Sequence, residues 1–253
     1  DIDSWLPKNP DLKDFLTPLC FASRLGQTDL VRLLLDRGSM AIDKQSAVRE
    51  YTPLYCAAAF APIDSALEIV PILLDRGSQA IDIPNSDDTT AVNSAAFFAR
   101  TDMVRLLLDR GSKAIDISNK YTHTPLGHAL LFQHQHPETA RLLLDRGADR
   151  QGKTDLFIAA ALGDTDEVKR ILDRDSSHIN TADTSDWNAT PLDISVFNGH
   201  RSVSELLLSR GADRRSMTSV YLASGMGDAD KVSLLLSEDI SEIDTPSQYV
   251  LKA

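Results

Sequence analysis

Apolar and polar residues follow a pattern along this chain that returns about every 33 positions. A short Ala- and Leu-rich segment that opens with threonine is followed by a second segment whose leucines lie at helical spacing. Apolar residues three and four positions apart line one face of an α-helix. Each copy of the pattern therefore predicts two short helices, and a period of this length indicates a repeat architecture.

Seven copies of the pattern follow one another in phase. The first segments run from TPLCFASRLG to TSVYLASGMG, and the second segments from VRLLLDRGS to VSLLLSED. A unit begins at each leading threonine: Thr17, Thr52, Thr90, Thr124, Thr154, Thr190 and Thr218. Because neither helix of a unit can bury its apolar face alone, we expect neighbouring units to stack into a solenoid held by nearest-neighbour contacts.

The ends of the helices carry recognisable signals. A threonine before the first helix can accept a backbone N–H, and the proline that follows it in several units suits the first helical position. In the second helix of residues 101–111, we expect Thr101 to cap the start and Gly111 to close the end in the left-handed conformation. An Asp-Arg-Gly sequence recurs at the ends of the second helices. Its aspartates and arginines, which we call the Asp-Arg-Gly row, are interpreted as solvated residues with a structural role: Asp36, Asp75, Asp109 and Asp145 beside Arg37, Arg76, Arg110 and Arg146.

The segments between units are predicted to be β-hairpin fingers. Residues 39–51, 78–89, 112–123 and 176–189 contain an extended Ala-Ile-Asp or His-Ile-Asn step followed by turn-forming residues. The junctions GADRQGKTDL and GADRRSMTSV are almost without a finger. Four additional residues precede the second helix of the second unit, where Pro71 predicts a late start or a bend, and two precede that of the fourth.

The Thr-Pro-Leu opening, the small residues in mid-segment, the glycine turn and the leucine triplet closed by glycine resemble the ankyrin repeat. This resemblance covers residues 17–253 and implies an all-α repeat solenoid of helix-turn-helix units joined by fingers, two of them shortened. Residues 1–16 are then an N-terminal finger or capping segment ahead of the repeat domain. We expect the chain to be an excerpt or a processed form of a longer protein.

Composition narrows the classes of partner. The 26 basic and 37 acidic side chains give a net charge of −11, which repels phosphate backbones, so nucleic acid is not expected as a partner. No apolar run reaches the length of a membrane span, so a membrane is not expected as a partner. Cys20 and Cys56 lie in apolar stretches and are interpreted as small core residues, which favours a reducing intracellular compartment, cytoplasmic or nuclear.

Residue types that carry chemistry are sparse. No phosphate loop, nucleophile elbow, paired zinc-ligand cysteines or zinc-protease motif is present, so neither a cofactor nor a metal is expected. His134 and His136 could ligate a metal, but are interpreted as decoration of an inter-helix loop. His128 is interpreted as a core histidine with a satisfied hydrogen bond, or alternatively as a ligand contact. Asp193 could be a site acid with a raised pKa.

The resemblance implies that the end of the first helix and the fingers form a concave binding face. At the eighth and ninth places of that helix this chain carries a nearly continuous apolar ribbon, whereas polar residues are common there in the family. The expected binding residues are Arg24, Leu25, Phe60, Phe97, Phe98, Arg100, His128, Leu131, Phe132, Leu162, Phe197 and Met226. The competing interpretation is that these apolar residues pack on one another in the core.

The function favoured by the sequence is a non-catalytic recognition module. Its groove would hold a peptide, a helix or a partner domain, or another part of a longer parent chain. The alternative is a small-molecule binder or unusual enzyme that uses the apolar pocket with His128, Arg100 or Asp193. A purely structural spacer is the third possibility.

Overall fold

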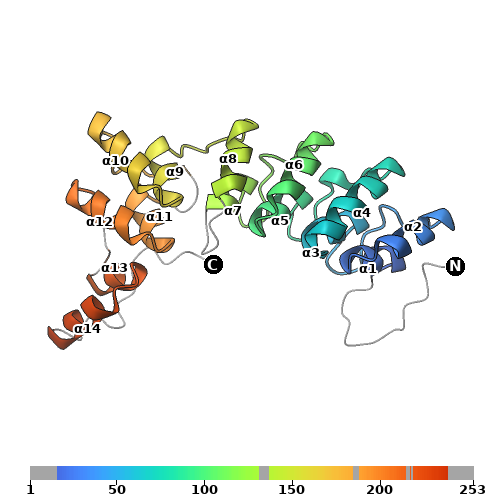
Figure 1. The fold of residues 1–253 in the computed structure, drawn as a ribbon, viewed down its shortest axis with the longest axis horizontal. Coiled ribbons are helices and arrows are strands. Elements are labelled where there is room, and N and C mark those ends of the chain that lie inside the picture. Colours follow the sequence, from blue (N-terminus) through green and yellow to red (C-terminus); the bar gives the residue numbers. More distant parts are fainter. Residues whose placement is uncertain (1–15, 131–136, 185–187, 215–216, 218, 239–253) are drawn as a thin grey trace. The chain divides into compact units, whose positions relative to one another are not determined.

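The computed structural model describes residues 16–130, 137–184, 188–214, 217 and 219–238. Short helices come in pairs throughout these ranges, as Figure 1 shows. They are α1 (Pro18–Arg24), α2 (Thr28–Asp36), α3 (Pro53–Phe60), α4 (Ile63–Asp75), α5 (Ala91–Phe97), α6 (Thr101–Asp109), α7 (Pro125–Leu130), α8 (Pro137–Asp145), α9 (Asp155–Ala161), α10 (Thr165–Arg174), α11 (Pro191–Phe197), α12 (Arg201–Ser209), α13 (Ser219–Gly225) and α14 (Ala229–Glu238). The predicted all-α stack of helix pairs is confirmed.

The chain divides into two compact units. Unit 1 comprises residues 1–129 and 138–149, and unit 2 comprises residues 130–137 and 150–253. In unit 1 the first helices α1, α3 and α5 pack on one another in order, and the second helices α2, α4 and α6 do the same. In unit 2, α9 packs on α11 and α10 on α12. The predicted boundary between residues 1–16 and a domain of residues 17–253 stays a prediction.

Threonine caps begin the first helices, as the sequence predicts. The Thr17 hydroxyl accepts the backbone N–H of Cys20 at 3.1 Å, and the same bond recurs at the other capping threonines. The predicted cap at Thr101 is wrong, because α6 begins at Thr101 itself and the hydroxyl bonds Thr139 of α8 instead. Gly111 closes α6 with a φ of 90°, the left-handed conformation predicted for it.

Small residues let the first helices approach closely. Residues 57–59 of α3 are alanines and all are buried, as are Ala95 and Ala96 of α5. Leucine and isoleucine from the second helices, such as Ile69 and Leu73 of α4, fill the space behind them. Fully burying a side chain of this size contributes about 1.5–3 kcal/mol, so the helix pairs depend on their neighbours for stability.

The fingers are closed by turns. The N–H of Asn85 donates to the carbonyl of Thr89 at 3.0 Å, and Asn119 bonds His123 in the same way. The predicted extended Ala-Ile-Asp step is wrong for the second finger, where Ala80–Asp82 forms a short 3-10 helix, η2. Within the described residues no β-strand is present, so these loops have hairpin-like closure without a strand ladder. Neighbouring loops are joined by single bonds, such as Ser86 N–H to the Arg49 carbonyl at 3.0 Å.

An aspartate in each full finger of unit 1 braces the following repeat. The Asp43 carboxylate accepts the Ser78 hydroxyl at 2.5 Å and the next backbone N–H at 2.9 Å. Asp82 accepts the same pair of donors from Ser112 and the residue after it. The aspartate of the Ala-Ile-Asp step is therefore a structural acceptor at each junction.

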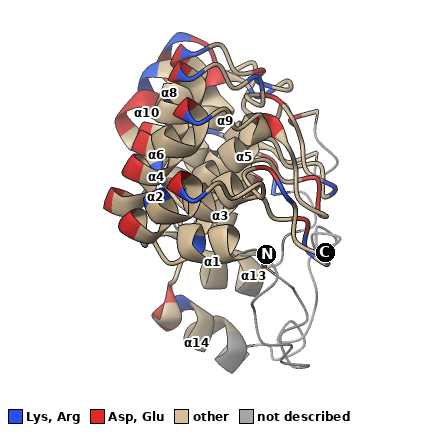
Figure 2. Ribbon diagram, turned by 90° about the vertical axis from the view of Figure 1, so that its right-hand side faces the viewer, with Lys and Arg blue, Asp and Glu red and all other residues tan. Residues whose placement is uncertain are grey.

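The Asp-Arg-Gly row forms ion pairs between repeats. The Arg76 guanidinium lies 2.7 Å from the Asp36 carboxylate, and Arg110 lies 3.1 Å from Asp75. Further pairs of this kind are Arg146–Asp109 in unit 1 and Arg210–Asp173 in unit 2. All are solvent-exposed, so each stabilises the fold by at most about 1 kcal/mol. Figure 2 shows these charges on the second helices, whereas α3 and α5 carry none.

The four additional residues of the second unit lengthen a helix. α4 runs from Ile63 to Asp75 without interruption and contains Pro71, so the predicted late start is wrong. The insertion is absorbed as an additional turn at the N-terminal end, because Asp64 and the apolar residues after it continue the helical pattern. The smaller insertion of the fourth unit lies outside the described residues.

A buried ion pair joins two loops of unit 2. The Lys153 ammonium lies 3.5 Å from the Asp183 carboxylate, and both side chains are almost fully buried. Asp183 also accepts the backbone N–H of Ala189 at 2.9 Å. Lys153 belongs to the short junction before α9 and Asp183 to the finger before α11, and the Thr184 N–H also donates to the Gln151 carbonyl at 3.2 Å between the same two loops.

Candidate functional site

The first part of the candidate site is an aromatic group between α1 and α3. We call Arg24, Tyr51, Tyr55 and Phe60 the Phe60 cluster. The two tyrosine rings are stacked with centroids 5.0 Å apart, and each meets Phe60 edge-on. The exposed Arg24 guanidinium lies 4.9 Å from the centroid of the Phe60 ring, at cation–π distance.

The Tyr55 hydroxyl fixes this cluster to the next repeat. Asn85 donates to the hydroxyl at 3.1 Å, and the Ser94 side chain of α5 also hydrogen-bonds it. Burial raises the pKa of Tyr55 to about 12, which keeps the phenol neutral. The side chain therefore positions the cluster and takes no part in acid–base chemistry at neutral pH.

The second part of the site lies one repeat further along, at the end of α5. We call Phe97, Phe98, His123 and His128 the Phe97 cluster. The phenylalanine rings meet edge-to-face with centroids 5.0 Å apart and are 41% and 48% exposed. The His128 ring packs against Phe97 at 5.2 Å, and the His123 ring against His128 at 5.0 Å.

His128 is a buried histidine whose two ring nitrogens are engaged, which confirms its interpretation as a core residue. Its Nδ1 lies 3.4 Å from the Asn93 carbonyl and its Nε2 lies 3.2 Å from Nδ1 of His123. Burial, followed by the neighbouring His123, lowers the pKa of His128 to about 4. His128 is only 6% exposed, so it packs against the Phe97 ring from the buried side.

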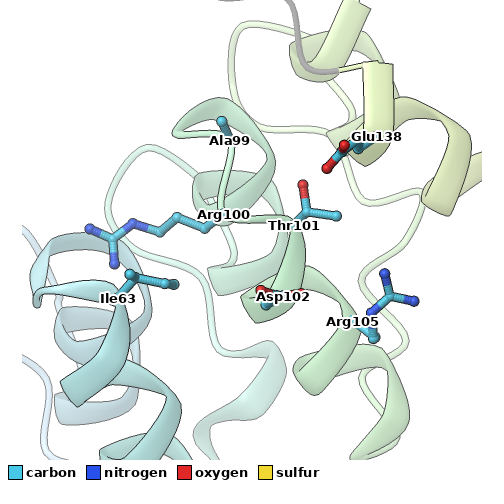
Figure 3. A pocket seen from close by; sticks show the side chains of 7 residues that line it. All are labelled: Ile63, Ala99, Arg100, Thr101, Asp102, Arg105 and Glu138. Carbon is cyan, nitrogen blue, oxygen red and sulfur yellow. The ribbon is translucent and has the colours of Figure 1, made fainter.

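Arg100 makes a bond to the preceding repeat. Its Nη1 donates to the carbonyl of Ala61 at 2.6 Å, and Figure 3 shows the side chain directed toward Ile63 at the start of α4. Partial burial lowers the pKa of Arg100, which nevertheless stays charged. Its role as an orienting group for a ligand stays a prediction, with one guanidinium nitrogen already in use.

An open pocket of about 370 Å³ adjoins Arg100. Figure 3 shows its lining, in which Thr101 and Glu138 face one another and Asp102 and Arg105 follow along α6. The lining is mainly polar and charged. The pocket therefore differs from the aromatic clusters in the polarity of its lining, although two of its residues, Ala99 and Arg100, directly follow Phe98 in the chain.

The remaining predicted binding residues differ in exposure. Leu25 in unit 1 and Phe197 in unit 2 are exposed, Leu162 is half-buried and Met226 is buried. Leu131 and Phe132 lie outside the described residues, as do His134 and His136. Phe21 is exposed as well, although it was not among the predicted binding residues. It was missed because its place in the next repeat is occupied by Cys56, which is buried.

Polar residues of unit 2 that could have served a site act in the scaffold. The Asp193 carboxylate accepts the backbone N–H and the hydroxyl of Thr190, both at 2.8 Å, and completes a capping box at the start of α11. Asn198 donates to the Ala161 carbonyl at 2.8 Å, and His200 bonds the same carbonyl at 3.0 Å. These contacts satisfy the C-terminal end of α9.

Two further properties of the described chain bear on its chemistry. No three His, Cys, Asp or Glu side chains among the described residues lie close enough together to hold a metal ion. None of the helices in the described ranges is long and apolar enough to cross a membrane.

The chain matches two family models. The model described as Ankyrin repeats (3 copies) matches residues 2–83 and 64–154, and the one described as Ankyrin repeats (many copies) matches residues 156–208. No curated protein matches the sequence. The matched ranges cover most of the chain and span the helix pairs from α1 and α2 to α11 and α12, so the protein belongs to the ankyrin-repeat family.

Proposed function

We propose that unit 1 binds a peptide segment, a helix or a domain of a protein partner through the Phe60 and Phe97 clusters. Ankyrin repeats are generally protein–protein interaction modules. The observation that carries the proposal is the exposed pair Phe97 and Phe98, whose rings are held edge-to-face while remaining close to half exposed. Exposed aromatic groups on a rigid helical support are the usual anchors of recognition surfaces.

The energetics favour apolar anchoring at this pair. Burying a phenylalanine side chain contributes about 1.5–3 kcal/mol, and each ring here has roughly half of that contribution still available. Because Phe97 already packs on His128, its side chain loses little conformational freedom when a partner binds. The contacts that hold the cluster therefore reduce the entropic cost of recognition.

The Phe60 cluster supplies a polar group beside a second apolar surface. Arg24 is exposed and lies over Phe60, where it can orient a carbonyl or carboxylate of the bound segment. α3 packs against α5, and the Tyr55–Ser94 bond joins the Phe60 cluster to α5, the helix that ends at Phe97. A segment that spans both clusters would use Phe97 and Phe98 as anchors and Arg24 for orientation.

Site-specific photo-crosslinking in native extract tests this proposal. A photoreactive phenylalanine analogue at position 98 should yield a discrete crosslinked protein. The matched control position is Leu33 of α2, which is 47% exposed and lies on the second-helix face. The same analogue at position 33 should yield none.

A second experiment separates binding from folding. The double variant Phe97→Ala, Phe98→Ala should lose at least tenfold in affinity for the crosslinked partner, while its thermal midpoint falls by only a few degrees because about half of each ring is already buried. Leu33→Ala should likewise lower the midpoint slightly but leave the affinity unchanged. Undiminished affinity in the double variant would refute the proposal. A collapse of the thermal midpoint would instead place the two rings in the core.

A small-molecule ligand is the second candidate function, favoured only by the pocket beside Arg100. Its volume of about 370 Å³ lies in the range of small-ligand sites. Such sites are mostly apolar, whereas charged Asp102, Arg105 and Glu138 line this one. A thermal-shift screen of small anions, repeated with Arg105→Ala, tests this candidate: only a stabilisation that the variant abolishes supports it.

A further inference from the structure

Two thiols meet between the first two repeats of unit 1. Cys20 of α1 and Cys56 of α3 are both buried and neither is in a disulfide. Their sulfur atoms lie 2.8 Å apart. A disulfide bond is about 2.05 Å long, so the sulfurs are less than about 1 Å from bonding distance. The sequence predicted both residues as small core side chains, which their burial confirms, but it gave no sign of this contact.

The geometry of the repeat creates the contact. Counting each leading threonine as place one, Cys20 occupies place four and Cys56 occupies place five of the following first helix. The next junction joins the same two places, through the hydrogen bond between Tyr55 and Ser94. The side chains at these places therefore face each other when first helices stack, and the thiol pair belongs to the packed interface.

We propose that Cys20 and Cys56 are an oxidation site and form a disulfide when a peroxide is the oxidant. The thiolate of one cysteine attacks a peroxide oxygen to give a sulfenic acid and hydroxide, which takes up a proton to become water. The second thiol then attacks the sulfenic sulfur, forms the S–S bond and releases another water. Two thiols and one hydrogen peroxide yield one disulfide and two waters, with two electrons passing from sulfur to oxygen.

Burial sets the conditions under which the reaction occurs. Since both sulfurs are covered in the folded state, a peroxide reaches them only during transient separation of α1 from α3. The second thiol then closes the bond as the helices repack, because the sulfurs return to 2.8 Å. Oxidation should accordingly be slow in native buffer and faster in low urea.

The bond would tie together residues 36 positions apart in the chain. A crosslink of this span removes many conformations from the unfolded chain, so it stabilises the folded state. Arg24 and Phe60 each lie one helical turn after a linked cysteine, so the bond would also fix α1 against α3 beneath the Phe60 cluster. The inference rests on the sulfur contact and is independent of the proposed function.

Oxidation of the purified chain tests the proposal. Treatment with hydrogen peroxide should lower the intact mass by about 2 Da, the loss of two hydrogens. A non-reducing peptide map should join the peptides that contain Cys20 and Cys56. The thermal midpoint should rise by roughly 5–10 °C and return to its starting value with dithiothreitol.

Matched variants complete the experiment. Cys56→Ser places at this position the residue that α5 has at the equivalent Ser94, and Cys20→Ser is its counterpart. Neither variant should lose mass or gain stability under peroxide. Any of three outcomes would overturn the proposal. Both thiols could remain alkylatable after oxidation in low urea, the disulfide could form between two chains, or each sulfur could be oxidised separately to a sulfinic acid.

Discussion

Single residues carry local backbone strain just before the first helices. The residue two places ahead of the leading threonine has a positive φ in five repeats. It is Glu50, Asp88, Thr122 and Asn188 after the full fingers, and Gly152 in the short junction before α9. This region is disfavoured for residues with a Cβ atom, and most of all for β-branched ones. Thr122, with a φ of 65°, is therefore the residue least suited to its backbone.

Glycine at this place should stabilise the protein. We predict that Thr122→Gly raises the free energy of unfolding by about 1 kcal/mol, the relief of strain less the larger entropy of the unfolded chain. Urea denaturation measures the change. Asn188→Gly is the comparison and should gain less, because asparagine tolerates the left-handed region. A loss of stability at position 122 would show that the threonine side chain contributes more than its strain costs.

The buried His128 should make stability depend on pH. Its pKa is about 4 in the folded protein and about 6.5 in the unfolded chain. Between these values the unfolded chain binds a proton that the folded chain does not, so stability falls as the pH decreases from about 6.5 to about 4. The loss from this residue should be about 3–4 kcal/mol and complete below pH 4.

A variant isolates this contribution. In His128→Leu, which copies the residue at the equivalent place of α13, the thermal midpoint should fall less between pH 6.5 and 4.5 than in the wild type. Part of the slope should persist, because burial also lowers the pKa of His123. An identical pH profile in the variant would mean that His128 does not supply the proton uptake.

At the scale of elements, α4 is the helix whose sequence works against its structure. Pro71 lies inside the helix, where it lacks the N–H that would bond the carbonyl four residues earlier. The equivalent residue of α2 is Arg32 and that of α6 is Arg105. We predict that Pro71→Arg raises the free energy of unfolding by about 1–3 kcal/mol, measured by thermal and urea denaturation. Unchanged or lower stability would show that packing against neighbouring helices requires the proline geometry.

The ion pair between two loops of unit 2 should contribute far more than the exposed ladder. Lys153→Met would leave the Asp183 carboxylate without its cation in a buried site, and we predict a loss of about 3–5 kcal/mol. Arg110→Met breaks the exposed pair with Asp75 and should cost at most about 1 kcal/mol. Equal losses in calorimetry would contradict the difference in burial.

The elements also show what a sequence pattern can and cannot predict. The helix pairs and threonine caps were predictable, because they depend on local spacing and on one side chain bonding nearby backbone. The fate of Pro71 was not, because an inserted segment can form a loop or another helical turn with similar local preferences. The partners of Lys153 and Arg100 were hidden as well, since both are set by loops of a neighbouring repeat.

Over the whole molecule, the apolar ribbon predicted from the sequence has no uniform exposure. Phe97 and Phe98 are exposed, whereas Met226 at the ninth place of its unit is buried. A place in the repeat determines which way a side chain points, but the adjacent repeat determines how much of it is covered. The candidate site is therefore better described as two defined aromatic clusters than as a continuous strip.

The aspartate braces of unit 1 have a consequence for how the length of such a chain can change. Asp43 meets Ser78 in the same manner as Asp82 meets Ser112, so these two junctions use matching donors and acceptors, whereas Ala148 takes the place of the serine at the next one. A duplicated repeat would find complementary partners on both of its sides without any new interface. Whole repeats can therefore be gained or lost by recombination at little cost in stability, whereas an insertion of a few residues must be absorbed within one unit, as in α4.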